Sequence, residues 1–173
     1  MYKGIVVLAV AFVSGLAMAA EEPAPLPKEG SGTSVAMGSV TLKVLPLGKD
    51  RMQMAWEFLG ANLDDSGKGL GHNTSIRCVG AALYVAGVPE NYANSCVFTR
   101  PDGDQYFTTD KLSAPSGLAL KGGVTQGTSV ITGGTGKLAG ITGTIEWTRY
   151  GVRPAMEGTA QTVTRGKANY KLP

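Results

Sequence analysis

The stretch Ile131–Thr144, with the sequence ITGGTGKLAGITGT, decides the fold class of this chain. It places five glycines among threonine, isoleucine and leucine. Glycine adopts positive φ angles without steric cost and lets two backbone segments approach each other closely. The flanking segments, Ser129–Ile131 and Thr144–Thr148, consist mainly of β-branched and aromatic residues that favour strands. The stretch therefore predicts a tight connection between two β-strands.

The glycines and the lysine of this stretch could suggest a nucleotide-binding loop, but the spacing of these residues excludes it. A P-loop ends in Lys followed by Ser or Thr, whereas Lys137 is followed by Leu138, and Ile131 occupies the place of the first glycine. The dinucleotide fingerprint opens a helix after a strand. Gly134, Gly136 and Gly140 do not have its spacing, and the residues after them are poor helix formers. We therefore interpret the glycines as structural.

The N-terminus indicates the compartment. One lysine precedes an apolar run, and Ala17-Met18-Ala19 has the small residues that a signal peptidase requires, so we expect a signal peptide over residues 1–19. An uncleaved membrane anchor is the alternative, although the apolar run is short for a bilayer span. Residues 20–32 are rich in proline, glycine and glutamate and predict a disordered leader. We expect residues 33–173 to form a single domain that is exported, periplasmic or secreted, with no membrane insertion after cleavage.

Composition narrows the classes of partner and cofactor. The chain has 16 Lys+Arg against 13 Asp+Glu and no basic run, which argues against a nucleic-acid partner. Cys78 and Cys96 are the only cysteines, and in an oxidising compartment they predict a disulfide, with free thiols as the alternative. Two cysteines and one histidine do not complete a zinc site without a carboxylate. We expect neither a metal nor a cofactor.

The remaining segments predict an all-β domain with many turns, consistent with 25 glycines in the chain. Arg51–Leu59 alternates with a period of two and places Met52, Met54, Trp56 and Phe58 on one face. Asp-Gly within Pro101–Asp104 predicts a hairpin turn rather than a calcium loop. The other expected strands are Val35–Leu47, Thr74–Val88, Ser95–Thr99, Gln105–Thr109, Leu118–Lys121, Val124–Ile131, Ile141–Tyr150 and Met156–Thr164. No stretch requires a substantial helix.

The segment Gly133–Gly143 resembles the strand-connecting glycine motif of the allene oxide cyclase and dirigent-protein group. Domain size, the all-β pattern and the place of the motif near the C-terminus agree with this resemblance. The two cysteines and Asp102-Gly103-Asp104 resemble small exported bacterial proteins with the same barrel. The resemblance implies an antiparallel eight-stranded β-barrel of calycin-like shape that holds a small apolar or phenolic ligand. It also implies that a homo-oligomer is possible.

Three functions are compatible with such a barrel. The first is binding of a small hydrophobic or aromatic molecule, with Met52, Met54, Trp56, Phe58 and Trp147 as candidate lining residues. The second is a cofactor-free isomerase or cyclase that acts on such a ligand. The third is a structural or interaction role with a filled interior. Whether the chain is an enzyme stays open at this point.

A proton-transferring group would be needed only by the second function. Glu146 and Tyr150 share one face of their expected strand, opposite Trp147 and Arg149, and could act as acid and hydrogen-bond donor if that face points inward. Glu57 lies opposite the Met/Trp/Phe face, and His72 is the only histidine. A solvated outer face and an exposed loop histidine explain the same residues without catalysis.

Overall fold

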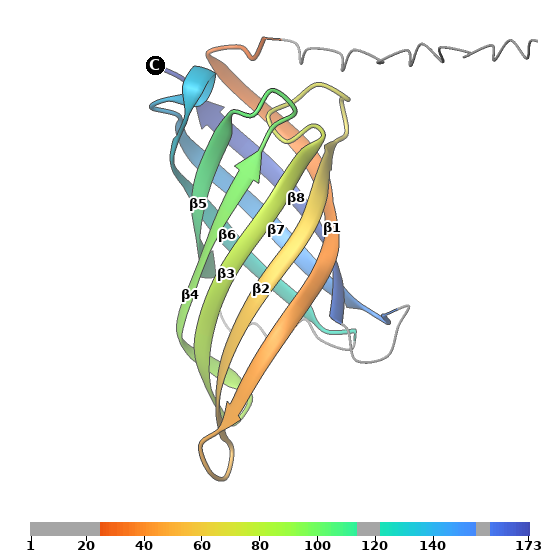
Figure 1. Ribbon diagram of the computed structural model, residues 1–173, viewed down its shortest axis with the longest axis vertical. Helices are drawn as coiled ribbons and strands as arrows, with labels where there is room; N and C mark the ends of the chain where they lie inside the picture. Colours follow the sequence, from red (N-terminus) through yellow and green to blue (C-terminus); the bar gives the residue numbers. More distant parts are fainter. Residues whose placement is uncertain (1–24, 114–121, 155–159) are drawn as a thin grey trace, which may run out of the picture.

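The computed structural model describes residues 25–113, 122–154 and 160–173. They form a closed antiparallel barrel in which the strands pair in sequence order and β1 also pairs with β8 (Figure 1). The all-β barrel that the sequence predicts is therefore confirmed. The strands are β1 (Glu29–Pro46), β2 (Arg51–Asp64), β3 (Thr74–Val85), β4 (Val88–Thr99), β5 (Gln105–Leu112), β6 (Val124–Gly134), β7 (Thr142–Val152) and β8 (Ala160–Lys171), with one short 3-10 helix, η1 (Gly136–Leu138).

Several strands extend beyond their expected bounds, such as β2 to Asp64 and β8 to Lys171, and two further differences concern a chain segment and a turn. β1 begins at Glu29, so part of the stretch expected as a leader is paired with β8. The single strand expected over Thr74–Val88 is divided into β3 and β4 by a hairpin turn at Ala86 and Gly87. Both turn residues have positive φ angles, 49° and 81°, as a type I′ turn requires. Alanine is rare in that conformation, and the single glycine beside it is a weak signal, so the sequence did not predict this turn.

Several expectations lie outside the described residues. They are the signal peptide over residues 1–19, the expected strand Leu118–Lys121 and the beginning of the expected strand Met156–Thr164. In the part of the chain that the structure describes, no helix is both long and apolar enough to cross a membrane.

The glycine-rich stretch forms the connection between β6 and β7, as predicted. Gly136 and Gly140 have φ angles of 51° and 77°, where a side chain would be strained. Between them η1 turns Leu138 inward, and Leu138 and Ile141 are each only 1% exposed. The glycines therefore allow a tight loop whose two aliphatic side chains close one end of the core.

Two large aromatic side chains inside the barrel lie over glycines on the neighbouring strand. Trp56 pairs with Gly80, and a Cβ atom at Gly80 would lie 2.5 Å from the Trp56 ring. Trp147 pairs with Gly127 in the same way, at 2.4 Å. The missing side chain of each glycine leaves room for a flat ring on a curved sheet, an arrangement known to compensate for glycine in strands.

The two ends of the barrel differ. The mouth end carries the β2–β3 loop, the β4–β5 hairpin, the β6–β7 connection and the C-terminus, whereas the far end carries the β1–β2 and β3–β4 hairpins (Figure 1). The far half of the interior is filled by a cluster of inward side chains. Its members are Met54, Ala82 and Tyr84, with Leu42, Met52, Trp56 and Tyr92 packed against them.

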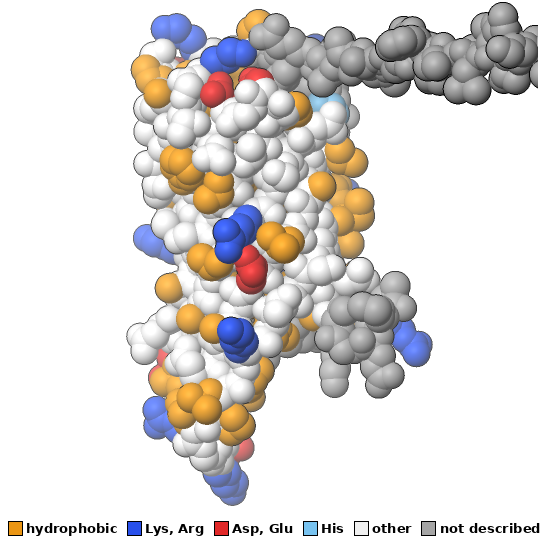
Figure 2. Space-filling model, in the orientation of Figure 1, with side chains coloured by type: hydrophobic (Ala, Val, Ile, Leu, Met, Phe, Trp, Pro, Cys, Tyr) orange, Lys and Arg blue, Asp and Glu red, His pale blue; other side chains and the backbone are white. Residues whose placement is uncertain are grey.

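Apolar side chains also occur on the outer wall, scattered among polar groups (Figure 2). Leu59 and Met37 are more than half exposed on neighbouring strands. At the far end, the projecting β1–β2 hairpin exposes Val44, Leu45 and Leu47. Isolated exposed apolar residues are common on protein surfaces and do not by themselves indicate a site.

Candidate functional site

A cavity of about 450 Å³ occupies the half of the barrel interior nearer the mouth. It extends from Trp147 and Arg149, deep on β7, to Lys68 in the exposed β2–β3 loop. The cavity lies above the filled far half, because the cluster around Met54 and Tyr84 does not line it. It therefore has a floor inside the barrel and reaches the surface at the mouth.

The middle of the cavity wall is mainly apolar. Inward positions of β2, β3 and β7 supply Phe58, Ile76 and Ile145. The ring of Phe98 also lines the wall and stacks on Tyr106, with ring centroids 4.5 Å apart. These side chains give a surface suited to a flat or aliphatic molecule.

The predicted disulfide is part of this wall. Cys78 and Cys96 lie directly opposite each other on β3 and β4, and their sulfur atoms are joined at 2.04 Å. Both residues are buried and face the cavity. A disulfide of this kind is compatible with an oxidising compartment.

The floor of the cavity contains a chain of hydrogen bonds that joins five strands. Trp56 Nε1 donates to Asn94 Oδ1 at 2.8 Å, and Asn94 Nδ2 donates to Asp110 Oδ2 at 2.8 Å. From the other side, Trp147 Nε1 donates to Ser129 Oγ at 3.0 Å, and Ser129 Oγ donates to Asp110 Oδ1 at 2.6 Å. The carboxylate of Asp110 is thus the central acceptor of the network.

Asp110 is a buried acid with a perturbed pKa. Its pKa is raised above the ordinary aspartate value, chiefly because burial removes water from the carboxylate. The hydrogen bond from Ser129, the charge of Arg149 and the hydrogen bond from Asn94 each act in the opposite direction. Perturbed acids in cavities are more often functional than ordinary surface carboxylates.

Arg149 is the cationic group of the floor. It follows Trp147 by two positions on β7, so both side chains point inward. Its guanidinium carbon lies 4.9 Å from the centroid of the Trp147 ring, and Nε donates to Thr164 Oγ1 at 3.3 Å. The charge of Arg149 also lowers the pKa of Tyr92, although burial raises that pKa by a larger amount. The floor therefore combines a buried acid with a cation.

The mouth of the cavity is partly polar. Asp64 is 8% exposed and accepts hydrogen bonds from the backbone N–H and the hydroxyl of Ser66. Gly69 lies against the Asp64 carboxylate, where a Cβ atom would clash. From the N-terminal side, Leu26 packs on the aliphatic cluster at the mouth and lines the cavity. The backbone N–H of Leu172 donates to Lys28 O at 2.6 Å and fixes this segment beside the C-terminus.

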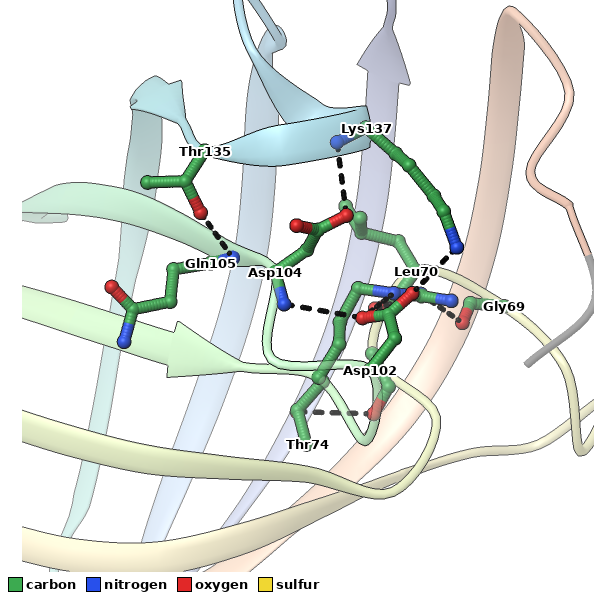
Figure 3. A network of polar contacts seen from close by, with 10 residues as sticks. Gly69, Leu70, Thr74, Asp102, Asp104, Gln105, Thr135 and Lys137 are labelled. Atoms are coloured by element: carbon green, nitrogen blue, oxygen red, sulfur yellow. Dashed lines mark hydrogen bonds and ion pairs between the residues drawn. The ribbon is translucent and has the colours of Figure 1, made fainter. Parts of the chain in front are cut away.

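A second polar network holds the loops of the mouth together (Figure 3). Arg100 is buried and donates from Nη1 to the carbonyl of Leu70 at 3.1 Å. Asp102 accepts from the backbone of Asp104 within the β4–β5 hairpin and lies 3.6 Å from Lys137 Nζ. The backbone N–H of Lys137 in turn donates to Asp104 Oδ2 at 2.9 Å. The two aspartates therefore stabilise the predicted hairpin and join it to the β6–β7 connection, and Arg100 joins it to the β2–β3 loop.

The predicted ligand-lining residues are divided between the two halves of the interior. Phe58 and Trp147 line the cavity. Met54 and Trp56 also point inward but lie in the filled far half, and Met52 packs against the same cluster. Trp56 nevertheless contributes to the floor, because its indole N–H holds Asn94.

The four candidate catalytic residues are not among the residues that line the cavity. Glu146 and Tyr150 are exposed on the outside of β7, which corresponds to the solvated-face interpretation. Glu57 forms an exposed ion pair with Arg77, with Oε1 and Nε 2.7 Å apart. His72 is half-buried in the β2–β3 loop, and its buried Nδ1 has no hydrogen-bond partner among the described residues.

Sequence reasoning missed Asp110 and gave Arg149 no role. Asp110 stands at the end of the expected strand Gln105–Thr109, where an aspartate indicates a turn. Strand alternation placed Arg149 on the same face as Trp147, and this was the one available signal. Only the strand register brings Asp110 opposite Ser129 and beside Asn94.

Among the described residues, no group of three or more His, Cys, Asp or Glu side chains is placed to hold a metal ion. Comparisons of the chain with models of protein families, with curated proteins and with solved structures find no match.

Proposed function

We propose that this protein binds a small, largely apolar or aromatic molecule inside its barrel. The observation that carries the proposal is the cavity of about 450 Å³ above a hydrogen-bonded floor. Binding sites for small molecules typically span roughly 300–1,000 Å³ and combine apolar walls with a few placed polar groups. The cavity has both features, and its volume argues against a barrel whose interior is entirely filled.

The site supports a second candidate function, a cofactor-free isomerase or cyclase. The observation that favours it is Asp110, an inward carboxyl group with a raised pKa that is held by Ser129 and Asn94. A group of this kind could exchange a proton with a bound ligand. Binding remains the first candidate, because both functions need a cavity but only the enzyme also needs a catalytic group.

The proposed compartment is the periplasm or the outside of the cell. The N-terminal sequence Met1–Ala19 and the disulfide between Cys78 and Cys96 support export. The resemblance of Gly133–Gly143 to the allene oxide cyclase and dirigent-protein motif supports an apolar or phenolic ligand, and it stays a resemblance.

The experiment that tests binding uses protein purified after expression of the full chain. A neutral aromatic probe, 2-naphthalenemethanol, is titrated while tryptophan fluorescence and heat are recorded. Because Trp147 lines the cavity, we expect saturable quenching with one probe per chain. The variants Ala168→Phe and Ala36→Leu enlarge side chains that line the cavity, and each should reduce the affinity at least tenfold by occupying its volume.

The matched control is Ala61→Phe, which adds the same ring at an exposed position of β2. It should bind the probe as the native chain does, and a thermal melt confirms that each variant is folded. Absence of probe binding by the native chain would overturn the proposal. Equal binding by the folded cavity variants and by Ala61→Phe would place the probe outside the barrel and would also overturn it.

A further inference from the structure

We propose that Arg149 on the cavity floor recognises a carboxylate, so that the ligand is an apolar or aromatic acid bound with its carboxylate innermost. This inference rests on the proposed function and names the chemical class of the ligand. It is carried by the position of a cationic group at the closed end of a mainly apolar cavity.

The guanidinium of Arg149 has unused hydrogen-bonding capacity. Arginine has five N–H donors arranged as a planar fork that matches the two oxygens of a carboxylate. Within the described residues, Nε donates to Thr164 Oγ1, and the guanidinium also interacts with the hydroxyl of Tyr92, which leaves further N–H donors for a ligand. The cation also contacts the face of Trp147, which holds the fork against the apolar wall.

The buried carboxylate of the floor, Asp110, is already engaged by other donors. No ion pair within 4 Å joins Asp110 to Arg149 in the described chain. Instead, one oxygen of Asp110 accepts from Ser129 and the other from Asn94. The floor therefore presents free donors to a ligand, and an anionic two-oxygen group complements them better than a hydroxyl group does.

The opposite end of the cavity disfavours an anion. Asp64 lies at the mouth, is nearly buried and is hydrogen-bonded by Ser66. A carboxylate at the mouth would lie between Asp64 and Lys68, whose exposed charge is screened by water. On the floor it meets the charge of Arg149 and an Asp110 side chain that burial favours as the neutral acid. The two ends of the cavity thus set the orientation of the ligand, with the apolar body between them.

Asp110 couples this recognition to pH. A bound carboxylate adds negative charge beside Asp110, whose pKa is already raised by burial, and so favours the protonated acid. The other groups facing Asp110 do not reverse this effect. Arg149 stays cationic, Asn94 and Ser129 do not titrate in this range, and burial raises the pKa of Tyr92 so that it stays neutral. Binding should therefore take up a proton.

The test compares two probes of the same size, 2-naphthoate and the neutral 2-naphthalenemethanol, by calorimetry on the native full chain. Hydrogen bonds to charged groups lead us to expect at least about tenfold tighter binding of the acid. Arg149→Met keeps the apolar stem and should abolish that preference, while Arg149→Lys should restore part of it. Arg165→Met removes an exposed arginine from the outside of β8 and should retain the preference.

The pH dependence of probe affinity is measured first on the native chain. The affinity for 2-naphthoate should fall as the pH rises through the raised pKa of Asp110, whereas the affinity for the alcohol should not change. Asp110→Asn should remove this dependence.

The outcomes separate the two proposals. If neither probe binds, the proposed function fails. If both bind with equal affinity at every pH, or if Arg149→Met keeps the preference for the acid, binding stands and the carboxylate inference is overturned.

Discussion

At the scale of single residues, the interior of this barrel is built from pairs of a large ring and a glycine. Trp147 lies over Gly127, and Trp56 lies over Gly80 on the neighbouring strand. Both indole N–H groups then donate into the floor network around Asp110. The glycines therefore determine where the floor of the cavity lies.

Gly127→Ala tests this role. Its Cβ atom would lie 2.4 Å from both the Trp147 ring and the backbone oxygen of Lys111. Neither atom can move without disturbing the sheet, so we expect a loss of about 1–3 kcal/mol in the free energy of unfolding. Urea denaturation followed by circular dichroism measures it.

The matched control is Gly166→Ala, another inward glycine of the barrel. Its Cβ atom would meet a side-chain carbon of Ile145 at 3.3 Å, a contact that a small shift of the side chain relieves. This variant should lose less than about 1 kcal/mol. Equal stability of the two variants would show that the ring–glycine pairs do not constrain the core.

The polar residues of the floor show why the candidate site could be predicted only in part. Alternation placed Phe58 and Trp147 each on one face of a strand, because a strand alternates with a fixed period of two, but it did not show which face points inward. It could not bring Asp110 to Ser129, because that contact depends on the pairing of β5 with β6. The register of strand pairing depends on the whole sheet, so a local sequence pattern cannot predict it.

At the scale of strands and turns, the φ preferences of the turn residues determined which turns could be predicted. The Asp-Gly turn before β5 and the glycine-rich connection before β7 were predictable, since their residues favour the required φ angles. The turn at Ala86 was not, since alanine has no such preference. The hairpin it forms brings β3 and β4 together and places Cys78 opposite Cys96.

The disulfide should stabilise this hairpin and the barrel with it. It joins residues 18 positions apart, and closing a loop of that length contributes about 3 kcal/mol in the chain-entropy view. We expect the double variant Cys78→Ala/Cys96→Ala to lose about that much, as measured by urea denaturation without reductant. Reductant should lower the stability of the native chain to a similar degree and leave the double variant unchanged. A double variant as stable as the oxidised native chain would contradict this account.

At the scale of the whole molecule, β1 and β8 close the ring of strands. Their pairing runs from Glu29 opposite Lys171 to Val40 opposite Ala160. Beyond it, Leu172 still donates to Lys28, so the backbone just before β1 lies beside the C-terminus at the mouth. Hydrogen bonds between the first and the last strand therefore close the ring without a covalent link.

Because the ring of strands is closed, the break in the chain can be moved to another loop without a change in the order of the strands. A circular permutant could join Pro173 to Pro25 through a short glycine–serine linker and begin instead at Lys49, in the projecting β1–β2 hairpin. Nothing lies within 4 Å of the Cβ position of Gly48, so a cut there disturbs no packing. We expect this permutant to fold, form the disulfide and melt cooperatively. A permutant that begins at Glu57, within β2, should not fold, because the cut interrupts pairing with both neighbours. If both permutants fold equally well, the barrel tolerates a break in any strand, and if neither folds, the native ends are needed for closure.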